Sequence, residues 1–373
     1  MTFLTVIAKN LLGRSTRSLL TITGVAIGIA AVVAMTSISR GFMKSGNRIY
    51  SAHGTDLVVS KLSSQTPVPP LFEESLGDQF RALPHVEVAD PVFVDILSVE
   101  DKPMVLFFGW EPGSYLWQHL KLVQGRWPTN DTERAVALGT LAAEMLERKV
   151  GDKVQILTGE FTVVGIFESG ALLENSALVT TLRQAQEITE SKGLIRHISI
   201  KLKAGTTEQD LKELYETVRT RFPGLRALSA NEFMESNLGI QSARVMSWAT
   251  SAIALTVGAV GVMNTLLMSV FERVHEIGIL LAIGWRRKRI MAMILLESVT
   301  LSLLGGIVGI AAGAGFVKLL QMLPRARGFI EGDMSINLTV LAITVALVLG
   351  ALSGLYPAYR ASRLQPSEAL RYE

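Results

Sequence analysis

Four long runs without a charged residue constrain this chain of 373 residues more than any other feature. They cover residues 18–39, 245–271, 298–317 and 334–359, and none contains Asp, Glu, Lys or Arg. About 20 apolar residues in a helix cross the roughly 30 Å hydrocarbon core of a bilayer. Each run is at least that long, so the sequence predicts four membrane-spanning helices.

The rest of the chain has the composition of a water-soluble protein. Although 49% of all residues are hydrophobic, the 36 Lys and Arg and the 33 Asp and Glu lie outside the four runs. There they make up about 25% of the residues, the usual charged fraction of soluble proteins. Most of this soluble part is one segment, residues 40–244, which is long enough for its own hydrophobic core.

Residue patterns in segment 40–244 predict a mixed α+β domain of two subdomains. Strands are expected at 92–99 and 198–202, and a hairpin of 154–157 and 161–167 around Thr158-Gly159-Glu160; helices are expected at 141–148 and 207–222, and a loop at 63–70. Ser229 and Glu232 have capping-box spacing. We therefore expect a helix that starts near Ser229 and continues into the second span as a stalk.

The distribution of basic residues predicts the topology. Short loops rich in Lys and Arg mark the cytoplasmic side, and the segment 272–297 contains the cluster Arg286-Arg287-Lys288-Arg289. This places both termini in the cytoplasm and residues 40–244 outside it, in a multi-pass protein of the cytoplasmic (inner) membrane. The first run is longer than the apolar region of a signal peptide, so we interpret it as a retained anchor.

The expected organisation follows from these assignments. Its parts are a cytoplasmic amphipathic N-terminal segment (1–17), the first span (18–39), a periplasmic core domain with stalk helices (40–244), the second span (245–271), a cytoplasmic coupling helix and loop (272–289), the third span (290–317), an external loop (318–333), the fourth span (334–359) and a cytoplasmic tail (360–373).

Motifs for enzymatic chemistry do not occur in this sequence. There is no cysteine, His275-Glu276 lacks the second histidine of a zinc-protease motif, and no Gly-Lys dipeptide is present for a phosphate-binding loop. We therefore predict no catalytic residue, no metal and no cofactor of its own. A net charge of +3 with a single basic cluster gives no support for nucleic-acid binding.

The predicted cytoplasmic turn is unusually apolar. Between Glu272 and Gly284, residues 277–283 are almost all apolar, although the segment faces water. Two interpretations remain open: a helix in the lipid headgroup layer, or a helix that docks into a groove of a cytosolic partner with Glu272 and Glu276 at its rim. The candidate coupling residues are Glu272, Arg273, Glu276, Ile277, Gly278, Ile279, Leu281, Ala282 and Gly284.

Further candidates lie within the spans. Gly24 and Gly28 in the first span and Gly305 and Gly309 in the third allow close helix packing, within the chain or in a dimer. Glu297 is the acidic residue that could lie in the membrane, either with a functional role or as the partner of a nearby Arg. The uncharged runs offer no charged path, which argues against pumping a hydrophilic solute.

The sequence resembles the FtsX-like, MacB-type permeases of ABC transporters, whose members include MacB, LolC, LolE and FtsX. Three blocks carry the resemblance: Leu20-Thr-Ile-Thr-Gly24-Val-Ala-Ile-Gly28, the block from Met263-Asn264 to Ala282-Ile-Gly284, and the tail with Gly354-Leu-Tyr-Pro357 and Glu368-Ala-Leu-Arg371. Leu280, Leu281 and Trp285 depart from the family pattern and suggest a dedicated partner.

The resemblance implies a fold, partners and a function. It implies four transmembrane helices with a large α+β extracytoplasmic domain between the first two, in a dimer with a second copy or a paralogous permease. Two copies of a cytosolic ATPase would bind ATP and Mg, and a periplasmic adaptor is expected. The expected function is export from the periplasm, or lipid or lipoprotein extraction, by mechanotransmission. The alternative is an FtsX-like transmitter that activates a cell-wall hydrolase.

Overall fold

The computed structural model describes residues 15–61, 68–323 and 332–365. The expected segment 1–17, most of the expected loop 63–70 and the tail block with Glu368 lie largely outside these residues. The chain divides into two compact units. We call residues 1–38, 244–319 and 332–373 the helical unit, and residues 39–243 and 320–331 the sheet unit.

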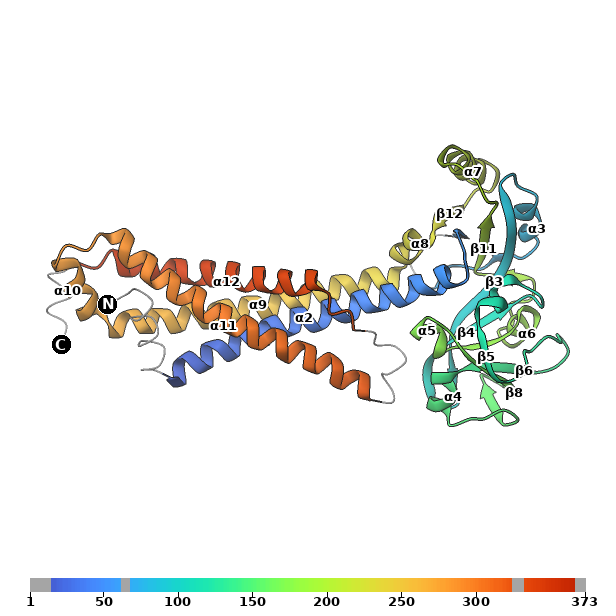
Figure 1. The fold of residues 1–373 in the computed structure, drawn as a ribbon, viewed down its shortest axis with the longest axis horizontal. Coiled ribbons are helices and arrows are strands. Elements are labelled where there is room, and N and C mark those ends of the chain that lie inside the picture. Colours follow the sequence, from blue (N-terminus) through green and yellow to red (C-terminus); the bar gives the residue numbers. More distant parts are fainter. Residues whose placement is uncertain (1–14, 62–67, 324–331, 366–373) are drawn as a thin grey trace. The chain divides into compact units, whose positions relative to one another are not determined.

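Four long helices carry the uncharged runs (Figure 1). They are α2 (Ser15–Ala52), α9 (Leu238–Glu272), α11 (Arg287–Met322) and α12 (Ile336–Ser362), and the short α10 (Val274–Ala282) lies between α9 and α11. All four are long and apolar enough to cross a membrane, since even 27 residues at 1.5 Å each extend about 40 Å. The unit boundaries fall inside α2, α9 and α11.

Helix α11 packs closely against two neighbours in the helical unit. A Cβ atom on Gly309 would lie 2.7 Å from the carbonyl oxygen of Ala26 in α2, so glycine is required for this approach. On its other side, the Ser298 hydroxyl donates a hydrogen bond of 2.6 Å to the carbonyl of Gly350 in α12. Apolar side chains from all four long helices, Val25 and Leu301 among them, form the buried core between these contacts.

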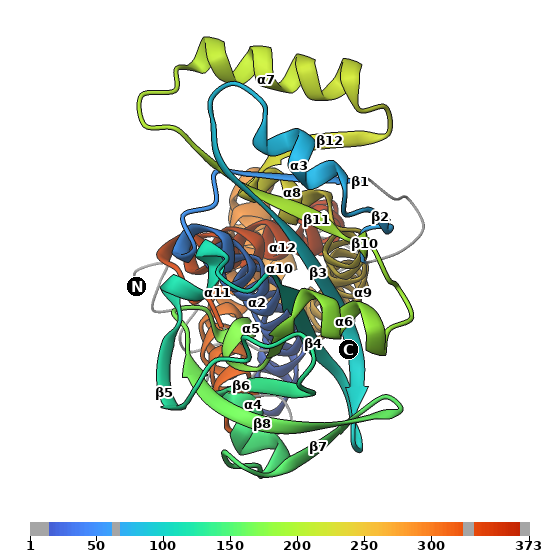
Figure 2. The same ribbon diagram turned by 90° about the vertical axis from the view of Figure 1, so that its right-hand side faces the viewer.

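The sheet unit contains one ten-stranded mixed sheet (Figure 2). Its strand order is β12-β1-β11-β3-β4-β9-β6-β8-β5, and β7 pairs with β3 and β8. The strands are β1 (Leu57–Lys61), β3 (Val86–Val99), β4 (Lys102–Trp110), β5 (Lys121–Gly125), β6 (Ala135–Gly139), β7 (Lys153–Ile156), β8 (Gly159–Glu168), β9 (Leu178–Thr181), β11 (His197–Leu202) and β12 (Leu225–Ser229). The two subdomains expected from the sequence therefore share one sheet.

Short helices and a small second sheet complete this unit. They are β2 (Phe72–Glu73) paired with β10 (Leu194–Ile195), and the helices α3 (Leu76–Arg81), η1 (Tyr115–His119), α4 (Thr140–Leu146), α5 (Leu172–Asn175), α6 (Leu182–Ile188), α7 (Glu208–Arg221) and α8 (Ala230–Ser236). Buried phenylalanines, including Phe80, Phe93, Phe107 and Phe161, fill the largest core cluster. The α+β fold class predicted from the sequence is confirmed.

Two local predictions need correction. The β7–β8 hairpin forms, but its turn consists of Leu157 and Thr158, because Gly159 already pairs with Ile156. The expected continuous stalk helix is interrupted: α8 begins with the predicted capping box at Ser229 but ends before Asn237. Asn237 has extended backbone angles, and its side-chain oxygen accepts from the Ile240 backbone N–H at 3.4 Å. An asparagine at this position stops one helix and caps the next.

Candidate functional site

Helix α10 is held at both ends by specific backbone geometry. It starts after Arg273, whose φ of −111° and ψ of 17° separate it from α9. At its other end the Trp285 N–H donates to the Leu280 carbonyl and the Gly284 N–H to the Leu281 carbonyl. Gly284 has a φ of +99°, so these bonds form the helix end that favours glycine. The predicted coupling helix, 272–284, is therefore two residues shorter at each end.

One face of α10 is buried in the helical unit. Ile277 is 2% exposed, and Val274 and Gly278 are also buried. Ile277 packs in a cluster with apolar residues of α11 and α12, such as Met293 and Ala358, and the half-buried Leu281 packs against the same cluster. Ile277 therefore anchors α10 to its own chain, and it is not available to a partner.

The opposite face of α10 is exposed to the surroundings. Its side chains recur at helical spacing, and they are His275, Glu276, Ile279 and Ala282 of α10 and Ile283, which directly follows the last residue of the helix. Ile279 is 39% exposed and Ile283 is 74% exposed. Glu272, at the end of α9, and Gly284 are exposed as well. We call the five side chains the outer face of α10. Ile283 was not among the predicted site residues, because periodicity alone does not say which face is inside.

Two charged residues beside α10 form a buried ion pair. The Arg273 Nη1 atom lies 3.6 Å from the Glu297 Oε2 atom of α11, and each side chain is about 10% exposed. The sequence allowed either a functional role for Glu297 or a pairing with a nearby Arg, and the structure supplies that Arg. Arg273, one of the predicted coupling residues, points into the helical unit.

The candidate packing glycines lie at helix contacts within the chain. A Cβ atom on Gly305 would lie 2.7 Å from the Cβ of Val25 in α2, and Gly309 approaches the same helix. A Cβ on Gly28 would lie 3.2 Å from the Ala254 carbonyl oxygen in α9. Gly24 faces α9 too, since its carbonyl oxygen would lie 3.5 Å from a Cβ on Gly258. These distances account for Gly28, Gly305 and Gly309 within one chain, whereas a Cβ on Gly24 itself would meet no heavy atom of the described residues within 4 Å.

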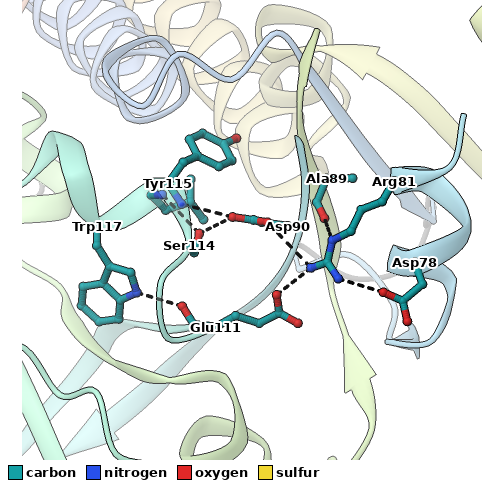
Figure 3. Close-up of polar contacts among 9 residues, drawn as sticks. Asp78, Arg81, Ala89, Asp90, Glu111, Ser114, Tyr115 and Trp117 are labelled. Carbon is teal, nitrogen blue, oxygen red and sulfur yellow. Dashed lines mark hydrogen bonds and ion pairs between the residues drawn. The ribbon is translucent and has the colours of Figure 1, made fainter. Parts of the chain in front are cut away.

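A polar network in the sheet unit surrounds Arg81 (Figure 3). Its guanidinium donates to Asp78 at 2.8 Å, to Glu111 at 2.6 Å and to the Ala89 carbonyl at 2.9 Å. Burial raises the pKa of the Glu111 carboxyl above its ordinary value, although the charge of Arg81 acts in the opposite direction. The Asp90 carboxylate lies 3.8 Å from Arg81 and accepts from the Ser114 hydroxyl. The network ties α3 to β3 and to the segment after β4.

A second buried contact joins the end of α2 to the core of the sheet unit. The His53 Nε2 atom lies 2.7 Å from the Glu174 Oε1 atom on α5, and both residues are almost completely buried. Nearby, the Ser45 hydroxyl accepts the backbone N–H of Leu173 at 3.1 Å. Lone histidines in the sequence gave no sign of this contact, because its partner lies 121 residues away.

Comparisons with known proteins agree along nearly the whole chain. A family model of the MacB-like periplasmic core domain matches residues 18–218, and a model of the FtsX-like permease C-terminal region matches residues 248–366. An uncharacterized ABC transporter permease of Methanocaldococcus jannaschii is 29% identical over 98% of this chain and 96% of its own length.

Other relatives are longer than this chain. The macrolide export ATP-binding/permease protein MacB of Nitrobacter winogradskyi is 29% identical over 95% of the chain, and that of Bdellovibrio bacteriovorus is 26% identical over 98%. The chain spans 58% and 61% of these two proteins. The crystal structure of the periplasmic region of MacB from Actinobacillus actinomycetemcomitans aligns with 50% of the chain at 16% identity, with a TM-score of 0.39.

Proposed function

The chain belongs to the MacB-type, FtsX-like family of ABC transporter permeases, and we propose that it transmits movement from a separate cytosolic ATPase to its sheet unit. It is a multi-pass inner-membrane protein with four apolar helices. In the proposed mechanism, the ATPase binds ATP and Mg, closes, and displaces α10. Helices α2 and α9, which each continue into the sheet unit, carry the displacement outward.

The outer face of α10 carries this proposal. Ile283 and Ile279 are exposed apolar residues on a helix whose other face is fixed by Ile277. An anchored helix with an exposed apolar stripe fits a groove on a partner, and His275 and Glu276 supply a polar rim. The exposed cluster Arg286–Arg289 beside it supports a cytoplasmic location for α10 and for both termini.

We propose that the transmitted movement drives export from the periplasm, or extraction of a lipid or lipoprotein from the outer leaflet. The MacB relatives carry the words macrolide export in their names, which supports export by this chain without fixing the substrate. The archaeal permease, matched over 96% of its own length, supports an ATPase on another chain. A second permease copy or a paralogue, and a periplasmic adaptor, complete the proposed assembly.

Substituting the outer face tests this function. We expect Ile283→Asp to remove the co-purifying ATPase from the chain in native membranes solubilised in mild detergent, because it places a charge in the proposed contact. The control is Met104→Asp, which puts the same charge on an exposed residue of the sheet unit and should retain the ATPase. Equal retention by both variants would contradict docking through α10 and leave it as a helix of the headgroup layer.

A further inference from the structure

The connection between α9 and α10 is a single residue. Arg273 leaves helical geometry while its neighbours on both sides keep it, and its N–H and carbonyl still bond to Val270 and Ile277 at 3.1 and 2.9 Å. One such residue joins the two helices but leaves their angle open to rotation about its backbone bonds. A displacement of α10 would therefore be transmitted to α9 only weakly, unless α10 has a second point of attachment.

The additional fixed point lies on α11. Arg273 reaches across to Glu297 at 3.6 Å, and Ile277 packs against Met293 and Ile294 of the same helix. The hollow that these residues line measures about 10 Å³, at or below the space that one water requires. The pair is therefore largely shielded from solvent, since only about 10% of each side chain is exposed.

Stability alone is a weak reason for such a pair. Replacing a buried ion pair by apolar residues of similar volume is often neutral or stabilising. Breaking a buried pair leaves an uncompensated charge, so each of the two groups favours positions in which the other is within reach. The pair sits where that property matters, at the one residue that breaks the α9–α10 helix.

We infer that Arg273 and Glu297 form a positioning pair that fixes α10 to α11, so that displacement of α10 moves α11. From there the displacement reaches α2, because Gly305, Gly309 and Gly313 bring α11 against the α2 backbone. This inference rests on the proposed function of α10. It adds a route through α11 to the direct path along α9, and it gives the pair a positioning role beside the packing contact of Ile277.

The first part of the test measures the position of α10 without any ATPase. Because the chain has no native cysteine, Ala282→Cys on α10 and Leu304→Cys on α11, both at exposed positions, carry two nitroxide labels in lipid nanodiscs. Electron double resonance should give one narrow distance distribution. Glu297→Gln should broaden it, because Arg273 loses its charged partner. An unchanged distribution in Glu297→Gln would overturn the inference.

The second part separates positioning from packing. The double variant Arg273→Met/Glu297→Leu removes both charges but keeps the volume, so it should fold and insert normally. We expect it to keep the broad distribution and to lose ATP-driven movement of the sheet unit while the ATPase stays bound. A narrow distribution with full movement would show that the pair only packs. If the native chain binds no ATPase, the proposed function fails, while the distance measurement still decides the positioning role.

Discussion

His197 is a buried titratable residue of the sheet unit with an unusual environment. It lies on β11, is 2% exposed, and contacts the rings of Tyr50 and Phe233 at 5.9 and 5.6 Å. Its Nδ1 atom has no hydrogen-bond partner among the described residues. Burial lowers the pKa of His197 to about 3. The folded chain therefore holds this imidazole neutral over a range in which the unfolded chain protonates it.

This difference in pKa predicts acid sensitivity. Below the ordinary histidine pKa of about 6.5, the unfolded state binds one proton more than the folded state. The contribution of His197 to the free energy of unfolding is therefore fully present above that pH, and it falls as the pH drops toward 3. We expect the His197 contribution to the free energy of unfolding to fall by about 2 kcal/mol between pH 7 and pH 5. His197→Phe, which keeps the aromatic contacts, should remove this part of the pH dependence. Hydrogen exchange of the β1 and β11 amides, corrected for intrinsic rates, measures the free energy of unfolding at each pH. The same pH dependence in the native chain and in His197→Phe would contradict the prediction.

The identity of several site residues could be predicted from the sequence. Which of their side chains are buried in the chain and which are exposed could not be predicted. The apolar turn indicated a functional helix around Ile277, because exposed apolar residues between two spans need a covering. Ile277 and Ile283 have the same chemistry, and their opposite positions depend on α11 and α12, which pack on one side of α10. The sequence suggested an Arg partner for Glu297 but did not identify it as Arg273, and the His53–Glu174 pair joins residues 121 positions apart, so no local pattern indicated it.

At the scale of elements, helix α11 connects the other parts of the helical unit. It contacts α2 through glycines, α12 through serine hydroxyls, and α10 through Glu297 and Met293. Small residues permit the close backbone approach that membrane helices use in place of a hydrophobic driving force. Added methyl groups should therefore disturb α11 where its glycines face α2 or α12, and should have little effect at Gly315, which faces open space.

Two glycines of α11 provide a matched comparison. Gly309→Ala would place a Cβ atom 2.7 Å from the Ala26 carbonyl oxygen, whereas Gly315 has no heavy atom within 4 Å of such a Cβ. We expect Gly309→Ala to destabilise the helical unit by about 1–3 kcal/mol through overpacking. Gly315→Ala should be neutral or slightly stabilising, because alanine favours the helix. Reversible unfolding in mixed detergent micelles gives both values, and similar losses would refute the role assigned to the α2–α11 contact.

Elements were predicted best where one physical signal dominated. The four spans follow from the absence of charge, and α7 follows from its helical periodicity; the structure adds a capping box at Thr207. The interruption at Asn237 was missed because periodicity continues on both sides of it, while a single capping side chain decides the break. Strand β3 extends from Val86 rather than 92, since its first half pairs with β11. That pairing involves a distant segment, and the sequence of β3 alone does not specify it.

At the scale of the whole molecule, helices α2 and α9 join the helical unit to the sheet unit, and the boundary also falls inside α11 near its last turn. Helices α2 and α9 each cross the boundary between the units without a break in the chain. The His53–Glu174 pair fixes the end of α2 to α5, so a shift of that helix would act on the core of the sheet unit directly. Two helices that are each continuous across the unit boundary are suited to pass on a displacement.

The proposed function requires that ATP on one side of the membrane moves the sheet unit on the other. The direct measurement uses the chain captured with its ATPase in nanodiscs and spin-labelled at Met104→Cys in the sheet unit and Ile253→Cys in α9, both exposed positions. We expect ATP with vanadate to shift the distance distribution between these labels, and Ile283→Asp to abolish the shift. An unchanged distribution while the bound ATPase hydrolyses ATP would contradict the proposed transmission.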